Sequence, residues 1–272
     1  MLRRHRSALP ALLVAGLYGA ALTAAAVVTL ISGDLGPLWG LTVFSAVTDD
    51  VTVTGGNLLL LIVAGLSWTW GIWEVLRGPL AGPPPRQDRD ILRLRVALYV
   101  ATATTWLLHV TAWIPVDVAV IDSAAMYVLV LLFMRVLGPG RQYMRGAGVL
   151  GYGGLTLMDV LGLVGLPVPE TMELVCGLAV LAWTILILRA QWDDDRWRTA
   201  TVKYGVAALV VPILLMLAAL PFAEEGSAVE ALGVVSSVLI MIWLAHSAHD
   251  LAAPRDQPAE AGSTVWSSGQ DH

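Results

Sequence analysis

A single glutamate ends a tryptophan-rich segment of a largely apolar stretch. The segment reads Ser-Trp-Thr-Trp-Gly-Ile-Trp-Glu and finishes at Glu74, with Trp73 next to it and Trp70 one helical turn earlier. Residues three and four apart share one face of a helix, so Trp70 and Glu74 are expected side by side. A carboxyl group enclosed by indole rings loses its hydration and would act as a Brønsted acid. The alternative is an interfacial ion pair with Arg77, three residues later.

A second polar group of residues ends the last apolar run. Trp243, His246 and Asp250 fall on one helical face, with His246 and Asp250 one turn apart. A carboxylate at that spacing can orient and charge an imidazole, so Asp250 is a candidate second acid or final base tuned by His246. The alternative is an ordinary helix end with solvated polar residues. A metal on Glu74, His246 and His249 is disfavoured because His-x-x-His is a weak signal, so neither metal nor cofactor is predicted.

One polar stripe and one isolated acid lie deeper in the apolar runs. Tyr99, Thr102, Trp106 and His109 follow one another at steps of three and four and therefore share a face. Pocket lining and core packing are equally open for Trp106 and His109. Asp159 interrupts a glycine-rich run, where a buried acid serves either a proton relay or a hydrogen bond to a neighbouring helix.

The elements that must position these residues are membrane-spanning helices. Of the 272 residues, 57% are hydrophobic and 14% are charged, whereas roughly a quarter are charged in soluble domains. Apolar runs of about 20 residues are long enough to cross a hydrocarbon core of roughly 30 Å. The fold predicted is an all-α polytopic bundle in the cell membrane with eight spans, at 9–31, 56–77, 93–114, 118–137, 146–166, 171–190, 203–222 and 230–250.

The charged residues alternate between the gaps that separate these runs. All 16 Lys and Arg residues can be placed on one side of the membrane, while the alternate gaps hold acids only. Because Lys and Arg are retained in the cytoplasm during insertion, both termini are predicted to be inside. Glu74 and Asp250 then belong to the same cytoplasmic end of the bundle.

Three segments carry more local expectations. The glycine-rich run 146–166 is predicted to be a tightly packed central helix and not a re-entrant segment, since small residues let helices approach closely. The outer segment 32–55 is expected either to form a short hairpin or to lie at the membrane interface. Residues 1–252 form the predicted transmembrane domain, and the tail 253–272, rich in Pro, Ser, Gly and acids, is predicted to be disordered.

The acids of the second and last runs carry a resemblance to a known family. The Trp73-Glu74 pair late in the second helix, and Asp250 near the end of the final one, resemble the small integral-membrane terpene cyclases of meroterpenoid and prenylated alkaloid pathways. That family is usually described with seven spans, whereas eight are predicted here. The resemblance implies a protonation-initiated cyclisation of a prenyl chain, such as farnesyl, on an aromatic or alkaloid precursor. Glu74 would be the general acid and Asp250 the second acid or final base.

Cyclisation would make use of further residues. A carbocation is stabilised by electron-rich walls, and aromatic faces contribute about 0.5–2 kcal/mol each through cation–π contact. The partners expected are the lipid bilayer and a lipophilic prenylated small molecule, with no nucleic acid because the basic residues are scattered. The residues predicted to bind substrate or stabilise the cation are Trp70, Trp73, Tyr99, Trp106, Trp243 and His246, with Asp159 as a possible additional acid.

Two other function classes stay open beside this leading hypothesis of a terpene cyclase. A small transporter or channel predicts a polar path across the whole bilayer, for example from Glu74 through His109 to Asp159. A non-catalytic membrane scaffold or plasmid-spread protein predicts that Glu74→Gln and Asp250→Asn leave its behaviour unchanged.

Overall fold

The protein is a multi-pass membrane protein built of helices. The structure, a computed structural model, describes residues 8–44, 54–77, 89–110, 118–138, 142–219 and 225–252. Every regular element of these residues is helical, which confirms the predicted fold class. Eight helical segments are long and apolar enough to span a membrane: Leu9–Ser32, Gly55–Leu76, Arg89–Val110, Ala119–Leu137, Gln142–Leu163, Glu170–Trp192, Thr199–Ala218 and Glu230–Asp250.

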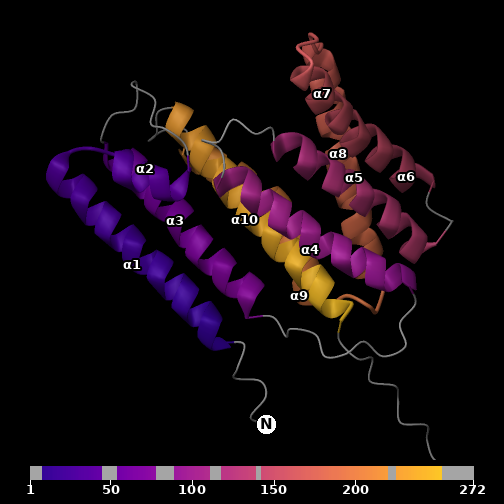
Figure 1. The fold of residues 1–272 in the computed structure, drawn as a ribbon, viewed down its shortest axis with the longest axis horizontal. Coiled ribbons are helices and arrows are strands. Elements are labelled where there is room, and N and C mark those ends of the chain that lie inside the picture. The colour runs from indigo at the N-terminus through magenta and orange to yellow at the C-terminus, as the bar shows by residue number, and fades with distance from the viewer. Residues whose placement is uncertain are drawn as a thin grey trace, which may run out of the picture.

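The last helix is the centre of one half of the bundle. Helix α10 (Glu225–Asp250) packs against α3 (Gly55–Leu76), α4 (Arg89–Val110) and α9 (Thr199–Ala219). Helix α1 (Ala8–Ser32) lies on the other side of α3 (Figure 1). Because three helices surround it, α10 is the most deeply buried of the eight spans.

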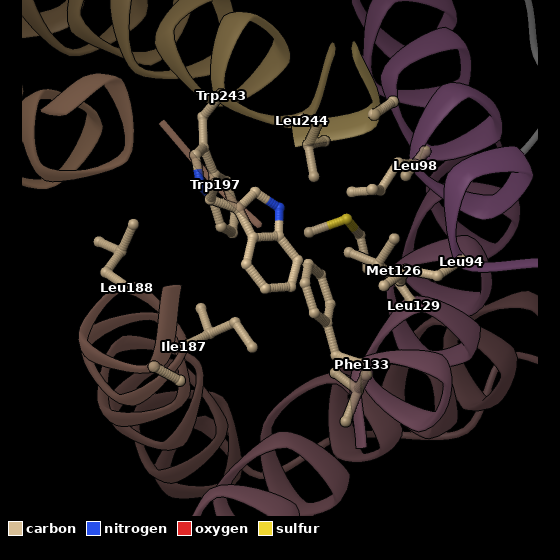
Figure 2. Close-up of a cluster of buried hydrophobic side chains, with 14 of the residues drawn as sticks. Leu94, Leu98, Met126, Leu129, Phe133, Ile187, Leu188, Trp197, Trp243 and Leu244 are labelled. Atoms are coloured by element: carbon tan, nitrogen blue, oxygen red, sulfur yellow. The ribbon is translucent and has the colours of Figure 1, made fainter. Parts of the chain in front are cut away.

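The other half contains α5 (Val118–Leu137), α6 (Gln142–Gly148), α7 (Gly154–Leu163) and α8 (Glu170–Trp192). Helix α5 packs along α4 and so joins the two halves. A shared core lies between them, in which Leu98, Phe133, Ile187, Trp197 and Trp243 converge from different segments (Figure 2). These side chains are apolar on the surfaces that meet, so close packing holds the halves together.

The glycine-rich span is a continuous helix at the edge of the bundle. It runs from α6 through a π-helical turn at Val149–Gly153 into α7. On one face, Gly151 lies against the backbone of Val180 in α8, so close packing through glycine is present. Gly148 and Gly153 face Val130 and Tyr127 of α5, and none of the α7 side chains is fully buried. The expected central position is therefore wrong: the glycines mark contacts with α5 and α8, and the span is the least buried of the eight.

A short helix lies inside the segment 32–55. Helix α2 (Gly36–Thr42) begins with a proline in its first turn, which suits a helix start, and buries Leu38 and Trp39 against α1 and α3. The predicted hairpin falls mainly on residues 45–53, outside the described residues, as do the connector 78–88 and the tail 253–272.

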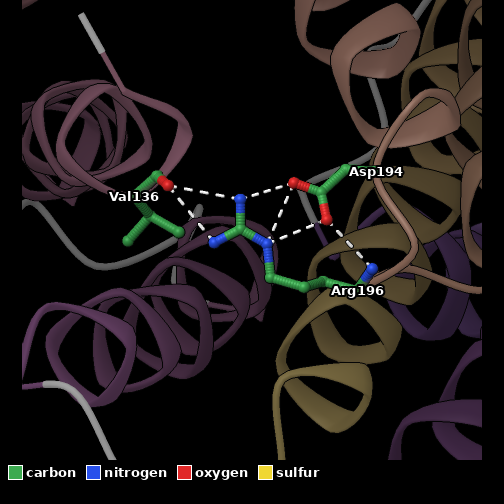
Figure 3. A network of polar contacts seen from close by, with 3 residues as sticks. All are labelled: Val136, Asp194 and Arg196. Carbon is green, nitrogen blue, oxygen red and sulfur yellow. Dashed lines mark hydrogen bonds and ion pairs between the residues drawn. The ribbon is translucent and has the colours of Figure 1, made fainter.

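The connection between α8 and α9 is tied to the end of α5. Nε of Arg196 donates to both carboxylate oxygens of Asp194 at 2.8 and 2.9 Å, and its two terminal nitrogens donate to the carbonyl oxygen of Val136 at 3.2 Å (Figure 3). The guanidinium therefore uses its planar set of donors to close the loop and satisfy a helix-terminal carbonyl. The next residue, Trp197, is thereby placed in the shared core.

Candidate functional site

Glu74 lies at the end of α3 and is buried between two nitrogen-bearing side chains. Its Oε2 atom is 2.7 Å from Nη2 of Arg77 and 3.1 Å from Nε2 of His246 on α10. Only 5% of its side chain is exposed. The structure therefore contains the ion pair with Arg77 that the sequence left open, and adds a histidine that lies 172 residues away in the chain.

His246 is the first of several aromatic rings in contact at this end of the bundle. Its ring centroid is 5.0 Å from that of Tyr204 on α9 and 5.9 Å from that of His249 on α10. Tyr204 in turn lies 5.8 Å from Trp70 of α3, and His249 lies 5.7 Å from Tyr99 of α4. We call these five residues, from four helices, the ring cluster.

The ring cluster lies where the basic segments gather. Arg77 forms an ion pair with Glu74, which contacts His246 of the cluster. The guanidinium of Arg95 lies 5.8 Å from the centre of the Tyr99 ring. We call this end of the bundle, where α3 and α10 end and α4 and α9 begin, the basic end. Of the predicted substrate-binding residues, Trp70, Tyr99 and His246 are brought together here, and Trp73, half-buried, is adjacent to Glu74.

Asp250 is also at the basic end, but its partners lie at the start of α9, in Arg198 just before the helix and in Thr201 of its first turn. Its Oδ2 atom accepts hydrogen bonds from the backbone N–H of Arg198 at 2.9 Å and from Oγ1 of Thr201 at 2.5 Å. These groups open α9, whose first N–H groups have no partner within the helix. Asp250 thus caps a neighbouring helix, while His246 reaches Glu74. The pairing of His246 with Asp250 expected from their spacing is not the contact that the structure makes.

The polar residues of α4 that face the inside of the bundle differ from the predicted set. Thr102 and Thr105 are buried, whereas Trp106 is 42% exposed and faces outward. Thr105 Oγ1 donates to Oδ1 of Asp122 on α5 at 3.0 Å, and Nδ1 of His109 lies 3.0 Å from the carbonyl oxygen of Thr105. The inward stripe is therefore Tyr99, Thr102, Thr105 and His109.

Asp122 is the acid that sequence reasoning missed. The sequence places Asp122 with a second acid at the start of the fourth span. Acids at this position are expected to stabilise the helix N-terminus. In the structure it is a cross-helix acceptor for Thr104 at 2.8 Å and for Thr105. The sequence feature that could have indicated these contacts is the pair of hydroxyl-bearing residues Thr104 and Thr105, one turn before His109. Asp159 of α7 is half-buried and lies within electrostatic reach of Asp122.

Trp243 belongs to the packed core and not to the surroundings of Glu74. Its Nε1 atom donates to Oε1 of Gln191 at 2.9 Å, and Nε2 of Gln191 donates to Oγ of Ser247 at 3.2 Å. Gln191 and Ser247 are fully buried, so this small network satisfies polar groups inside the bundle.

A groove and a smaller pocket lie elsewhere in the part of the bundle that the structure describes. A groove of about 660 Å³ runs between α4 and α5, and a pocket of about 180 Å³ lies among α8, α9 and α10 beside Thr184, Ser236 and Trp243. Neither is lined by Glu74 or Asp250. Within the described ranges, no three His, Cys, Asp or Glu side chains converge in a way that could hold a metal ion.

Comparisons of the chain with known protein families, with curated proteins and with solved structures found no match.

Proposed function

We propose that the protein transfers protons across the membrane, as a small proton-translocating or proton-coupled transporter. The observation that carries this proposal is a set of polar contacts at both ends of one face of α4: Glu74, His246, His249 and Tyr99 at the basic end, and Thr105 with Asp122 near the opposite end. The sequence had suggested a path from Glu74 through His109 to Asp159. The contacts favour His249, Tyr99 and Asp122 as its middle and outer members.

The basic-end half of the proposed path consists of groups that both give and accept protons. Glu74 contacts His246 at 3.1 Å, and His246 and His249 are ring neighbours. Imidazole can bind a proton on either ring nitrogen, so it can accept a proton on one side and release one on the other. His249 is in turn a ring neighbour of Tyr99, whose hydroxyl both donates and accepts.

The other half follows one face of α4. Thr102 and Thr105 succeed Tyr99 at three-residue steps, each a rise of about 4.5 Å along the helix. Thr105 then reaches Asp122 on α5. Ionisable side chains inside membrane spans are costly and usually mark ion or proton pathways, so the presence of Glu74 at one end and Asp122 at the other supports transport over a purely structural role.

A proton-flux assay tests this function. Purified protein is reconstituted in liposomes that contain a pH-sensitive dye, and a potassium gradient with valinomycin imposes a membrane potential. We expect acidification well above that of protein-free liposomes, and Asp122→Asn to reduce it by roughly tenfold, as for loss of one proton-transfer group. Glu173→Gln, an exposed acid outside the path, should leave it unchanged. Flux equal to that of protein-free liposomes would rule the proposal out.

The terpene cyclase is a second candidate, favoured by the burial of Glu74 beside the ring cluster. Trp70, Tyr204 and His246 offer aromatic faces near its carboxyl group, and such faces stabilise carbocations. For this chemistry Glu74 must first gain a proton and leave Arg77. The test is incubation with a farnesylated or epoxyfarnesylated precursor. A cyclase yields an isomer of equal mass that Glu74→Gln and Asp250→Asn abolish, whereas a proton transporter returns the substrate unchanged.

A further inference from the structure

The groove between α4 and α5 lies away from the ring cluster and has a different character. Its volume is about 660 Å³, within the range of roughly 300–1,000 Å³ that ligand sites occupy. Its walls are apolar, with Val96, Val100 and Val128 among them, and Ala97 and Ala125 contribute small side chains that leave it open. Arg93 is the single charged residue among those that line it.

The length of the groove matches one leaflet of a bilayer. Its lining extends on α5 from Ile121 to Leu132, which at 1.5 Å per residue is about 16 Å. Half of a hydrocarbon core is roughly 15 Å. The groove starts at the basic end, where Leu92 and Arg93 belong to the beginning of α4. An extended hydrocarbon chain entering from that side would fit along it.

Positive charge gathers at the same end of the groove. Arg135 follows Leu132 by three residues and Arg89 precedes Arg93 by four, so both lie on the groove side of their helices. All three arginines are exposed. Asp90 lies 3.3 Å from Arg93, but such an exposed pair contributes little and the local charge stays positive.

We propose that this groove binds an acyl chain of an anionic phospholipid, with the phosphate headgroup held by Arg93 and Arg135. The apolar walls account for the chain, and the arginines account for the preference for negative charge. Basic side chains at the cytoplasmic surface attract anionic lipids in this way.

Native mass spectrometry of the full-length protein tests the proposal, with phosphatidylglycerol and phosphatidylcholine of the same acyl chains added in detergent. We expect phosphatidylglycerol to be retained preferentially. The double variant Arg93→Gln/Arg135→Gln should weaken that preference by roughly tenfold or more. Ala125→Phe, which fills the groove, should reduce retention of both lipids. Arg145→Gln, an exposed arginine at the basic end but on α6, is the matched control.

Three outcomes would overturn the proposal. Equal retention of the two lipids by the unaltered protein would remove the headgroup preference. Unchanged retention in the double variant and in Ala125→Phe would place the lipid elsewhere. If the protein forms a lipid-free dimer that Ala125→Phe disrupts, the groove is occupied by a second copy of this chain and not by a lipid.

Discussion

Glu74 and Asp250 are both carboxylates near the end of an apolar helix, yet their surroundings give them different tasks. Glu74 contacts the half-buried His246 of the ring cluster, whereas Asp250 satisfies the start of α9. The contact of Glu74 with Arg77 could be predicted because it is local in sequence. The contact with His246 could not, because it depends on which face of α10 meets α3.

The capping role of Asp250 leads to a stability prediction. Asp250→Ala removes the acceptor for the N–H of Arg198 and the hydroxyl of Thr201. Loss of an N-terminal cap costs about 1 kcal/mol, so the detergent-solubilised variant should unfold at a lower temperature. Asp195→Asn, an exposed acid in the same connection, should unfold like the unaltered protein. Equal unfolding temperatures of Asp250→Ala and the unaltered protein would refute the capping role.

At the scale of elements, length and hydrophobicity were sufficient to place the spans. Runs of about 20 apolar residues have few alternatives to a membrane helix. Helix α2 escaped prediction because it is only seven residues long and carries no periodic signal. The π-helical turn at Val149–Gly153 and the edge position of its span also escaped, since both depend on how α8 packs against the glycines.

The glycine-rich span gives a matched pair of substitutions. A Cβ at Gly151 would lie 2.7 Å from the backbone nitrogen of Val180, which cannot move aside as a flexible side chain can. Gly151→Ala should therefore destabilise the protein by about 1–3 kcal/mol, as overpacking does. A Cβ at Gly162 would meet nothing within 4 Å, so Gly162→Ala should be neutral or slightly stabilising. Thermal unfolding of both variants in one detergent measures this, and equal effects would contradict the packing.

At the scale of the whole molecule, the alternation of charge predicts the orientation of the bundle. Arg145 and the other arginines of the basic end should face the cytoplasm, and Glu173 should face outside. The same alternation predicted that Glu74 and Asp250 belong to one end. It could not show whether they share a site, because two helix ends on one face can have separate partners.

Cysteine labelling in intact cells tests this orientation. The single native cysteine, Cys176, is buried and gives a low background. A membrane-impermeant maleimide should label Glu173→Cys from outside, and should label Arg145→Cys only after the cells are opened. The reverse pattern would invert the predicted topology and place the basic end outside.

The measurement that tests the central claim most directly is the proton flux of His249→Phe in liposomes. This change keeps an aromatic ring beside Tyr99 and removes the proton-exchanging group from the middle of the proposed path. Trp106→Phe, on the outward face of α4, is the control for a conservative aromatic change. We predict that His249→Phe lowers the flux by roughly tenfold or more, as for loss of one proton-transfer group, while Trp106→Phe retains it. A flux in His249→Phe equal to that of the unaltered protein would contradict the account.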